Sequence, residues 1–100
     1  MKIIYSLNAL ESLQEIVDFL NYHWTIKELN VFKTDLEKFL NSFDNHIISY
    51  PKLNPDSDLK FAFLGKKQVK VYFDQHSDFV EILLFLPSKG NPKTLENLLK

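Results

Sequence analysis

Apolar residues in the first half of the chain recur every three or four positions, which is the period of a helix that buries one face. A short apolar run at 2–6 precedes them and predicts a first strand. The apolar stripe of the first predicted helix consists of Leu10, Leu13, Val17, Leu20 and Trp24. Ser6 or Asn8 can cap the start of this helix, because both side chains accept hydrogen bonds from free backbone N–H groups.

A second helix is predicted to begin almost where the first one stops. Thr25 followed by Glu28 has the spacing of a capping box, which marks a helix start. The apolar stripe of this helix consists of Leu29, Phe32, Leu36, Phe39, Leu40 and Phe43. Pro51 ends the segment, and residues 44–50 fit either a last helical turn or a short strand. The short connection makes the two helices antiparallel neighbours.

The second half of the chain has the two-residue period of strands. Alternating positions predict three strands at 59–64, 68–73 and 79–86, joined as a meander. Asn91, with Pro92 after it, predicts a short C-terminal helix. The predicted fold class is therefore α+β, with the order β-α-α-β-β-β(-α) and a helical hairpin packed on a small antiparallel sheet.

The last predicted strand is apolar on both faces. If it alternates without interruption, one face carries Val80, Ile82, Leu84 and Leu86. The other face then carries Phe79, Leu83 and Phe85, interrupted only by Glu81. A helical hairpin can cover one of these faces. We therefore expect the other face to be covered by the C-terminal helix or by another chain.

Composition and charge narrow the classes of function. The chain has 100 residues, a length that predicts one domain at 1–100, and a net charge of −1. All twelve basic residues are lysines, and this balance argues against a broad nucleic-acid footprint. The sequence has no cysteine, no signal-peptide pattern and no apolar run near the ~20 residues of a membrane span. These features favour a cytoplasmic protein without a membrane segment.

The sequence gives no indication of a metal or cofactor site. His23, His46 and His76 fall in three different predicted elements and lack the spacing of metal ligands. Neither a phosphate-binding loop, a dinucleotide fingerprint nor a nucleophile elbow occurs in the chain. We therefore predict neither a metal nor a cofactor.

Taken together, the order of these signals resembles the RelE/ParE superfamily, the toxins of type II toxin–antitoxin systems. The opening IIYSLNALESLQEI resembles the family's first strand and its serine-started helix, with Ser6 and the early Ala9. The apolar run from Ile47 to Pro51 resembles the end of the family's second helix. The segments QVKVYF and FVEILLFL, followed by NP, resemble its final hairpin and the proline after it.

The resemblance implies a partner and a choice of targets. It implies a cognate antitoxin that wraps and masks the toxin, in assemblies such as a heterotetramer. RelE-like members cleave mRNA on the ribosome, whereas ParE-like members act on DNA gyrase and are not nucleases. The fold that it implies, a helical hairpin on an antiparallel sheet, agrees with the pattern above.

The resemblance also places candidate site residues. Basic residues of the family correspond to Lys60, Lys70 and Lys89, which are the candidates for catalysis, and with Tyr72 they are the candidates for target binding. Cleavage needs acid–base groups and cations around one phosphate. Nuclease members usually add a histidine, tyrosine or arginine near the C-terminus, and residues 88–100 contain none of these. The ParE-like branch is therefore favoured, while an mRNA endoribonuclease and an inactive partner-binding module stay open.

Two apolar sets are candidates for binding the antitoxin. Leu83 and Phe85 belong to the strand face that the helices are not expected to cover. Tyr22 and Trp24 fall at the tip of the helical hairpin, and exposed aromatic residues often contribute most to protein–protein binding.

Overall fold

The computed structural model describes residues 2–23, 25–45 and 50–87, which form two helices and four strands. The elements are β1 (Lys2–Tyr5), α1 (Leu7–His23), α2 (Ile26–Asn45), β2 (Lys60–Leu64), β3 (Val69–Gln75) and β4 (Phe79–Pro87). The predicted α+β class and this order of elements are confirmed. Trp24, part of the ambiguous segment 44–50 and the predicted C-terminal helix lie outside the described residues.

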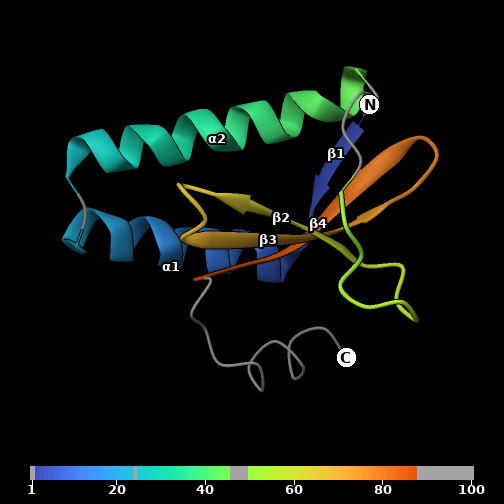
Figure 1. The fold of residues 1–100 in the computed structure, drawn as a ribbon. Helices are drawn as coiled ribbons and strands as arrows, with labels where there is room; N and C mark the ends of the chain where they lie inside the picture. Colours follow the sequence, from blue (N-terminus) through green and yellow to red (C-terminus); the bar gives the residue numbers. More distant parts are fainter. Residues whose placement is uncertain (1, 24, 46–49, 88–100) are drawn as a thin grey trace.

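The four strands form one mixed sheet in the order β1-β4-β3-β2. β2 pairs with β3 and β3 with β4 in antiparallel fashion, as a meander requires. β1 pairs with β4 in parallel, so the prediction of a wholly antiparallel sheet is wrong for this strand. The two helices run in opposite directions and connect β1 to the meander (Figure 1). The helices carry the chain from β1 at one edge of the sheet to β2 at the other edge, and the meander then brings β4 beside β1.

Both helices and one face of the sheet build the core. The buried cluster consists of Ala9, Ile16, Phe32, Phe39, Phe43, Ala62, Leu64, Val69, Val71, Phe73, Val80, Ile82 and Phe85. The stripe predicted for α2 is confirmed at its three phenylalanines, each at most 3% exposed. The stripe predicted for α1 is rotated, since Leu10 is 52% exposed while Ala9 and Ser12 are buried. Small side chains on this face let α1 approach β4 closely.

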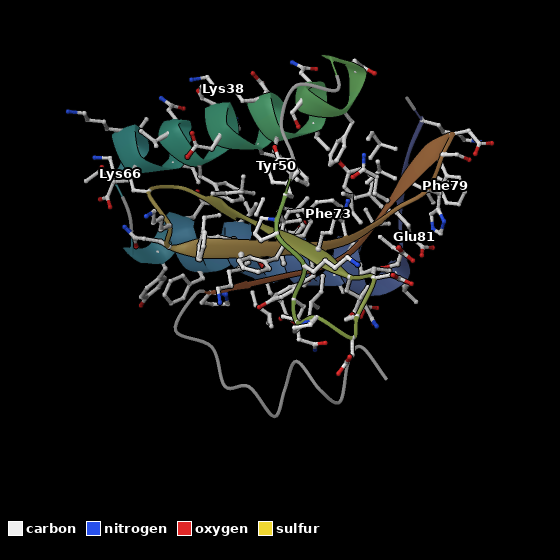
Figure 2. All side chains as sticks on the ribbon, turned by 45° about the vertical axis from the view of Figure 1, so that its right-hand side comes forward. Lys38, Tyr50, Lys66, Phe73, Phe79 and Glu81 are labelled. Carbon is white, nitrogen blue, oxygen red and sulfur yellow. The ribbon has the colours of Figure 1, made fainter. Side chains whose placement is uncertain are left out.

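Four aromatic rings form the centre of this core. Phe39 and Phe43 of α2 meet Phe73 of β3 edge to face, with ring centroids 5.2 and 5.3 Å apart. Tyr50 packs against Phe73 at 5.5 Å, and Figure 2 shows both rings beneath α2. The Tyr50 hydroxyl also lies 2.8 Å from the Ser42 hydroxyl oxygen. These contacts fix the chain after α2 against the sheet.

The helix starts follow the predicted chemistry. The Ser6 hydroxyl oxygen accepts the Ala9 N–H at 3.0 Å, so Ser6 rather than Asn8 caps α1. At α2, Glu28 N–H donates to the Thr25 hydroxyl oxygen and Thr25 N–H donates to the Glu28 carboxylate, each at 3.3 Å. This reciprocal pair is the predicted capping box.

A β-bulge in β4 changes which side chains reach the core. Tyr72 lies opposite Leu84 but Phe73 lies opposite Ile82, so Leu83 has no partner in the register with β3. The extra residue shifts the alternation that follows it. Phe85 therefore joins the core at 1% exposure, and the prediction that it shares the uncovered face with Leu83 is wrong.

Two serines, Ser6 at the cap of α1 and Ser12 within α1, satisfy the backbone at this bulge. β1 ends at Tyr5, opposite Ile82, so the following part of β4 has no strand on that side. The Ser6 hydroxyl donates to the Leu83 carbonyl at 3.1 Å, and the Ser12 hydroxyl accepts the Phe85 N–H at 2.9 Å. Side-chain hydroxyls thus replace the missing ladder partners of β4.

Candidate binding face of the sheet

The face of the sheet opposite the helices carries a compact group of side chains, which we call the second sheet face. It is defined by Phe61, Phe63, Lys70, Tyr72, Leu84 and Leu86. Cross-strand partners share a face, and the register pairs these residues with one another across β2, β3 and β4. None of them belongs to the core cluster. This face contains two of the four predicted target-binding residues.

Lys70 lies beside two aromatic rings of β2. Its ammonium nitrogen is 5.4 Å from the ring centroids of both Phe61 and Phe63, within the range of cation–π attraction. The two rings meet edge to face at 5.6 Å, and Phe63 is 43% exposed. The lysine is therefore a positioned cation next to an accessible ring, an arrangement suited to binding rather than to proton transfer.

Tyr72 is unsuited to acid–base chemistry at neutral pH. Its side chain is 4% exposed and lies between Phe61 and Leu84 in the register. Burial raises the pKa of the Tyr72 hydroxyl above its ordinary value, because the phenolate would lose hydration. The hydroxyl thus stays protonated, and direct contact with a target would require the surrounding side chains to move.

The other end of the second sheet face is acidic. Asp74 follows Tyr72 by two residues and lies opposite Glu81, which places both carboxylates on this face. Glu81 is labelled in Figure 2, close to Phe79 at that end of the sheet. Directly opposed like charges repel each other and would also repel a phosphate chain laid across the strands. Two carboxylates therefore lie on the same side of the sheet as Lys70.

Lys60 does not lie with Lys70 and Tyr72. It pairs with Phe73, whose side chain is in the core, and its ammonium donates to the Gln75 side-chain oxygen at 3.1 Å. The target-binding candidates Lys60 and Lys70 therefore lie on opposite faces of the sheet, because the register places Lys60 on the side of the helices and Lys70 on the other side. Lys89 lies outside the described residues.

The candidates for antitoxin binding fall into different environments. Leu83 is half-buried at the bulge, and Phe85 is enclosed in the core, so Phe85 is not an accessible contact. Tyr22 is 87% exposed near the end of α1, and Ile26, at the start of α2, is 80% exposed. Trp24, between them, lies outside the described residues. A binding role for Tyr22 stays a prediction.

Several negative findings concern the described residues alone. Across 2–23, 25–45 and 50–87, no three histidine, cysteine or acidic side chains gather in a way that could hold a metal ion. His76 contacts the Asp74 carboxylate at 3.4 Å and stacks on Phe79, with ring centroids 4.2 Å apart. Neither α1 nor α2 combines the length and apolar character needed to cross a membrane.

The alternation of the sequence divides the residues of β2 between two faces, but it does not show which face packs against the helices. Phe61 and Phe63 face away from the core, whereas the smaller Ala62 and Leu64 pack beneath the helices. The alternation shows that these sets are on opposite faces, and only the register with β3 brings Lys70 to Phe63. The pairing of β2 with β3 brings these residues together, and this pairing could not be read from the sequence alone.

Comparison with protein-family models finds none that matches this chain, and comparison with curated proteins finds no match. The resemblance to the RelE/ParE superfamily therefore stays a prediction from the sequence.

Proposed function

We propose that the protein is the toxin of a type II toxin–antitoxin pair, neutralised by a cognate antitoxin. Its action is ParE-like, directed at DNA gyrase or at another target that is not cleaved. Two features support this proposal. The order of strand, helical hairpin and three-stranded meander agrees with the sequence resemblance to the RelE/ParE superfamily. In addition, the second sheet face holds a binding group rather than a cleavage group.

The separation of Lys60 from Lys70 is the observation that favours a non-nucleolytic action. RNA cleavage requires several cations and a proton-transfer group around one phosphate. Here Lys60 faces the core side, Tyr72 is buried and protonated, and Asp74 opposes Glu81 on the face that carries Lys70. Lys70 and Phe63 instead form a contact point for a protein target.

Expression of the chain alone in bacteria tests the proposal. We expect growth arrest, inhibition of gyrase supercoiling by the purified protein, and no ribosome-dependent mRNA cuts in primer extension. Lys70→Gln should weaken the arrest, because it removes the positioned cation from the second sheet face. Lys33→Gln, at an exposed position of α2, is the matched control and should leave the arrest intact.

Lys60→Gln distinguishes the alternatives. A RelE-like nuclease would lose activity in both the Lys60 and the Lys70 variants and would leave cut sites in mRNA. The proposed function predicts loss in the Lys70 variant alone. Unaffected growth with the unmodified chain would contradict any toxin and would favour an inactive partner-binding module.

A further inference from the structure

Two side chains of the second sheet face are almost fully buried, although both helices pack on the other face. Tyr72 is 4% exposed and Leu84 is 1% exposed, and they lie opposite each other on β3 and β4. Neither belongs to the core cluster that α1 and α2 cover. A side chain on a sheet face that meets water keeps part of its surface exposed. A layer of other atoms therefore covers this pair.

The neighbouring strands do not supply that layer. β1 ends at Tyr5, opposite Ile82, so no strand lies beside Leu84 on that side. Phe63, on the same face but on the outer strand β2, is 43% exposed. Exposure on this face thus falls from β2 towards β4, and the cover is centred on Tyr72 and Leu84.

The loop before β2 lies at the far side of this face. Lys52 pairs with Lys60, and the Leu53 N–H donates to the Leu59 carbonyl at 2.8 Å, so the loop follows the outer edge of β2. β3 separates β2 from β4 in the sheet. Since neighbouring strands lie about 4.8 Å apart, Leu84 is roughly 10 Å from β2. The loop is therefore badly placed to cover Leu84.

The segment 88–100 has the sequence and the length to form the cover. It follows β4 directly, and β4 carries Leu84 and ends at Pro87. Leu95, Leu98 and Leu99 have the spacing of one apolar helix face. The helix predicted to start at Pro92 would be about 14 Å long at roughly 1.5 Å per residue. This length matches about three strand spacings of a sheet.

We propose that the C-terminal segment 88–100 covers the second sheet face, with its three leucines packed on Tyr72 and Leu84. The segment has three lysines and one glutamate, and this positive balance complements Asp74 and Glu81 at the acidic end of the face. Its attachment to β4 keeps it beside the face at a high effective concentration. A second copy or another protein would have to displace it.

The inference deepens the proposed function and in this respect rests on it, because the cover limits where a target can bind. Tyr72 is closed off while the segment stays in place. Lys70 and the exposed ring of Phe63 remain accessible on the β2 side. The target of the proposed toxin therefore contacts this side of the face first, and Tyr72 only after the segment is released.

Nuclear magnetic resonance of the full chain, with ¹³C-labelled leucine and valine methyl groups, tests the inference. We expect nuclear Overhauser contacts between the methyl groups of Leu84 and those of Leu95 or Leu98. A soluble gadolinium chelate should broaden the methyl signals of Leu7, which is 71% exposed, and leave those of Leu84 sharp. Val80, which is fully buried in the core, reports whether the fold is intact.

Two substitutions in the segment form a matched pair. Leu98→Asp places a carboxylate on the apolar side of the predicted helix, so Leu84 should lose its protection while Val80 keeps it. Asn97→Asp adds the same charge one position away, off the apolar side, and should leave both residues protected. Leu95→Asp should repeat the effect of Leu98→Asp.

Four results would overturn the inference. They are broadening of Leu84 in the unmodified chain, equal protection of Leu84 in the Leu98 and Asn97 variants, contacts of Leu84 with Leu53 or Leu59 instead of the segment, and loss of protection on dilution. The third would assign the cover to the loop, and the fourth to a second copy. If Leu98→Asp also exposes Val80, the contacts in the unmodified chain decide.

The same samples separate this inference from the proposed function. Growth arrest without contacts between Leu84 and the segment would reject the cover and keep the toxin. These contacts without growth arrest would reject the toxin and keep the cover.

Discussion

Ser12 shows how one polar side chain can position a helix against a strand. Serine is a poor helix former, because its hydroxyl competes for nearby backbone groups. Here the hydroxyl donates to the Ala9 carbonyl at 3.1 Å and accepts the buried Phe85 N–H at 2.9 Å. The side chain is 7% exposed. Its hydrogen bonds satisfy both the helix and the bulged strand.

Replacement of Ser12 by alanine should therefore destabilise the protein. The Phe85 N–H would stay buried without an acceptor, a loss of about 1–3 kcal/mol in the free energy of unfolding. Urea denaturation should show a lower midpoint with an unchanged slope. Ser77→Ala is the control, because the Ser77 hydroxyl donates to the carboxylate of Asp78 at an exposed position. If both variants unfolded at the same midpoint, the Ser12–Phe85 bond would contribute nothing measurable.

At the scale of elements, the turn between β2 and β3 has an unusual backbone. Gly65, Lys66 and Lys67 have positive φ angles of 62°, 58° and 68°, and the Gln68 N–H closes the turn on the Gly65 carbonyl at 3.2 Å. Turns of this mirror-image type favour asparagine and glycine at their central positions. Lysine in the left-handed region costs about 1–2 kcal/mol per residue. The Asp35–Gly65 hydrogen bond helps to hold this costly turn in place.

Lys67→Gly should consequently raise the stability of the hairpin. Glycine adopts a positive φ without steric penalty, and we expect a gain of roughly 1 kcal/mol after its extra freedom in the unfolded chain is counted. Thermal unfolding followed by circular dichroism measures the change. Lys67→Ala, which removes the same charge but keeps the steric penalty, should leave the melting temperature nearly unchanged. Equal stabilisation by both variants would indicate that charge, and not φ, determines the effect.

At the scale of the whole molecule, the bulge decides which part of β4 belongs to the core. Val80 and Ile82 precede it and Phe85 follows it, yet all three are buried among the helices and β3. Regular alternation would have placed Phe85 with Leu83. The hydroxyl groups of Ser6 and Ser12 bond to the backbone of β4 that β1 leaves unpaired, and they stabilise the bulge in this environment.

Variants of Phe85 and Leu83 measure this difference. Phe85→Ala should lower the free energy of unfolding by about 3–5 kcal/mol, because it leaves a cavity in the core. Leu83→Ala, at a half-buried position of the same bulge, should cost clearly less. Urea denaturation gives both values. A Phe85 variant of undiminished stability that lost partner binding would restore the interpretation of Phe85 as a contact residue.

The elements whose signals are local were predictable from the sequence. The Thr25–Glu28 capping box and the Ser6 cap involve residues three positions apart, and both are present. The stripe of α2 also follows from its spacing. The stripe of α1 was not predictable to the residue, because its closest contacts with β4 use Ala9 and Ser12 instead of larger apolar side chains.

The candidate surfaces were predictable only in part. Lys70 and Tyr72 do share the second sheet face, as their spacing on one strand requires. The contact of Lys70 with Phe63 and the position of Lys60 depend on the register between β2 and β3. The hydrogen bond between Gly65 and the Asp35 carboxylate spans thirty positions of the sequence, a separation that no local pattern reveals.

The sequence by itself determined the order of the elements, their caps and the turn positions, because interactions between near neighbours in the chain specify these features. The tertiary structure decided the parallel pairing of β1 with β4, the bulge that buries Phe85 and the placement of Lys60 and Lys70 on opposite faces. These features depend on contacts between distant residues. A change of one residue in the register of a strand moves each of its side chains to the other face of the sheet. The packing partners from the rest of the chain therefore decide which register forms.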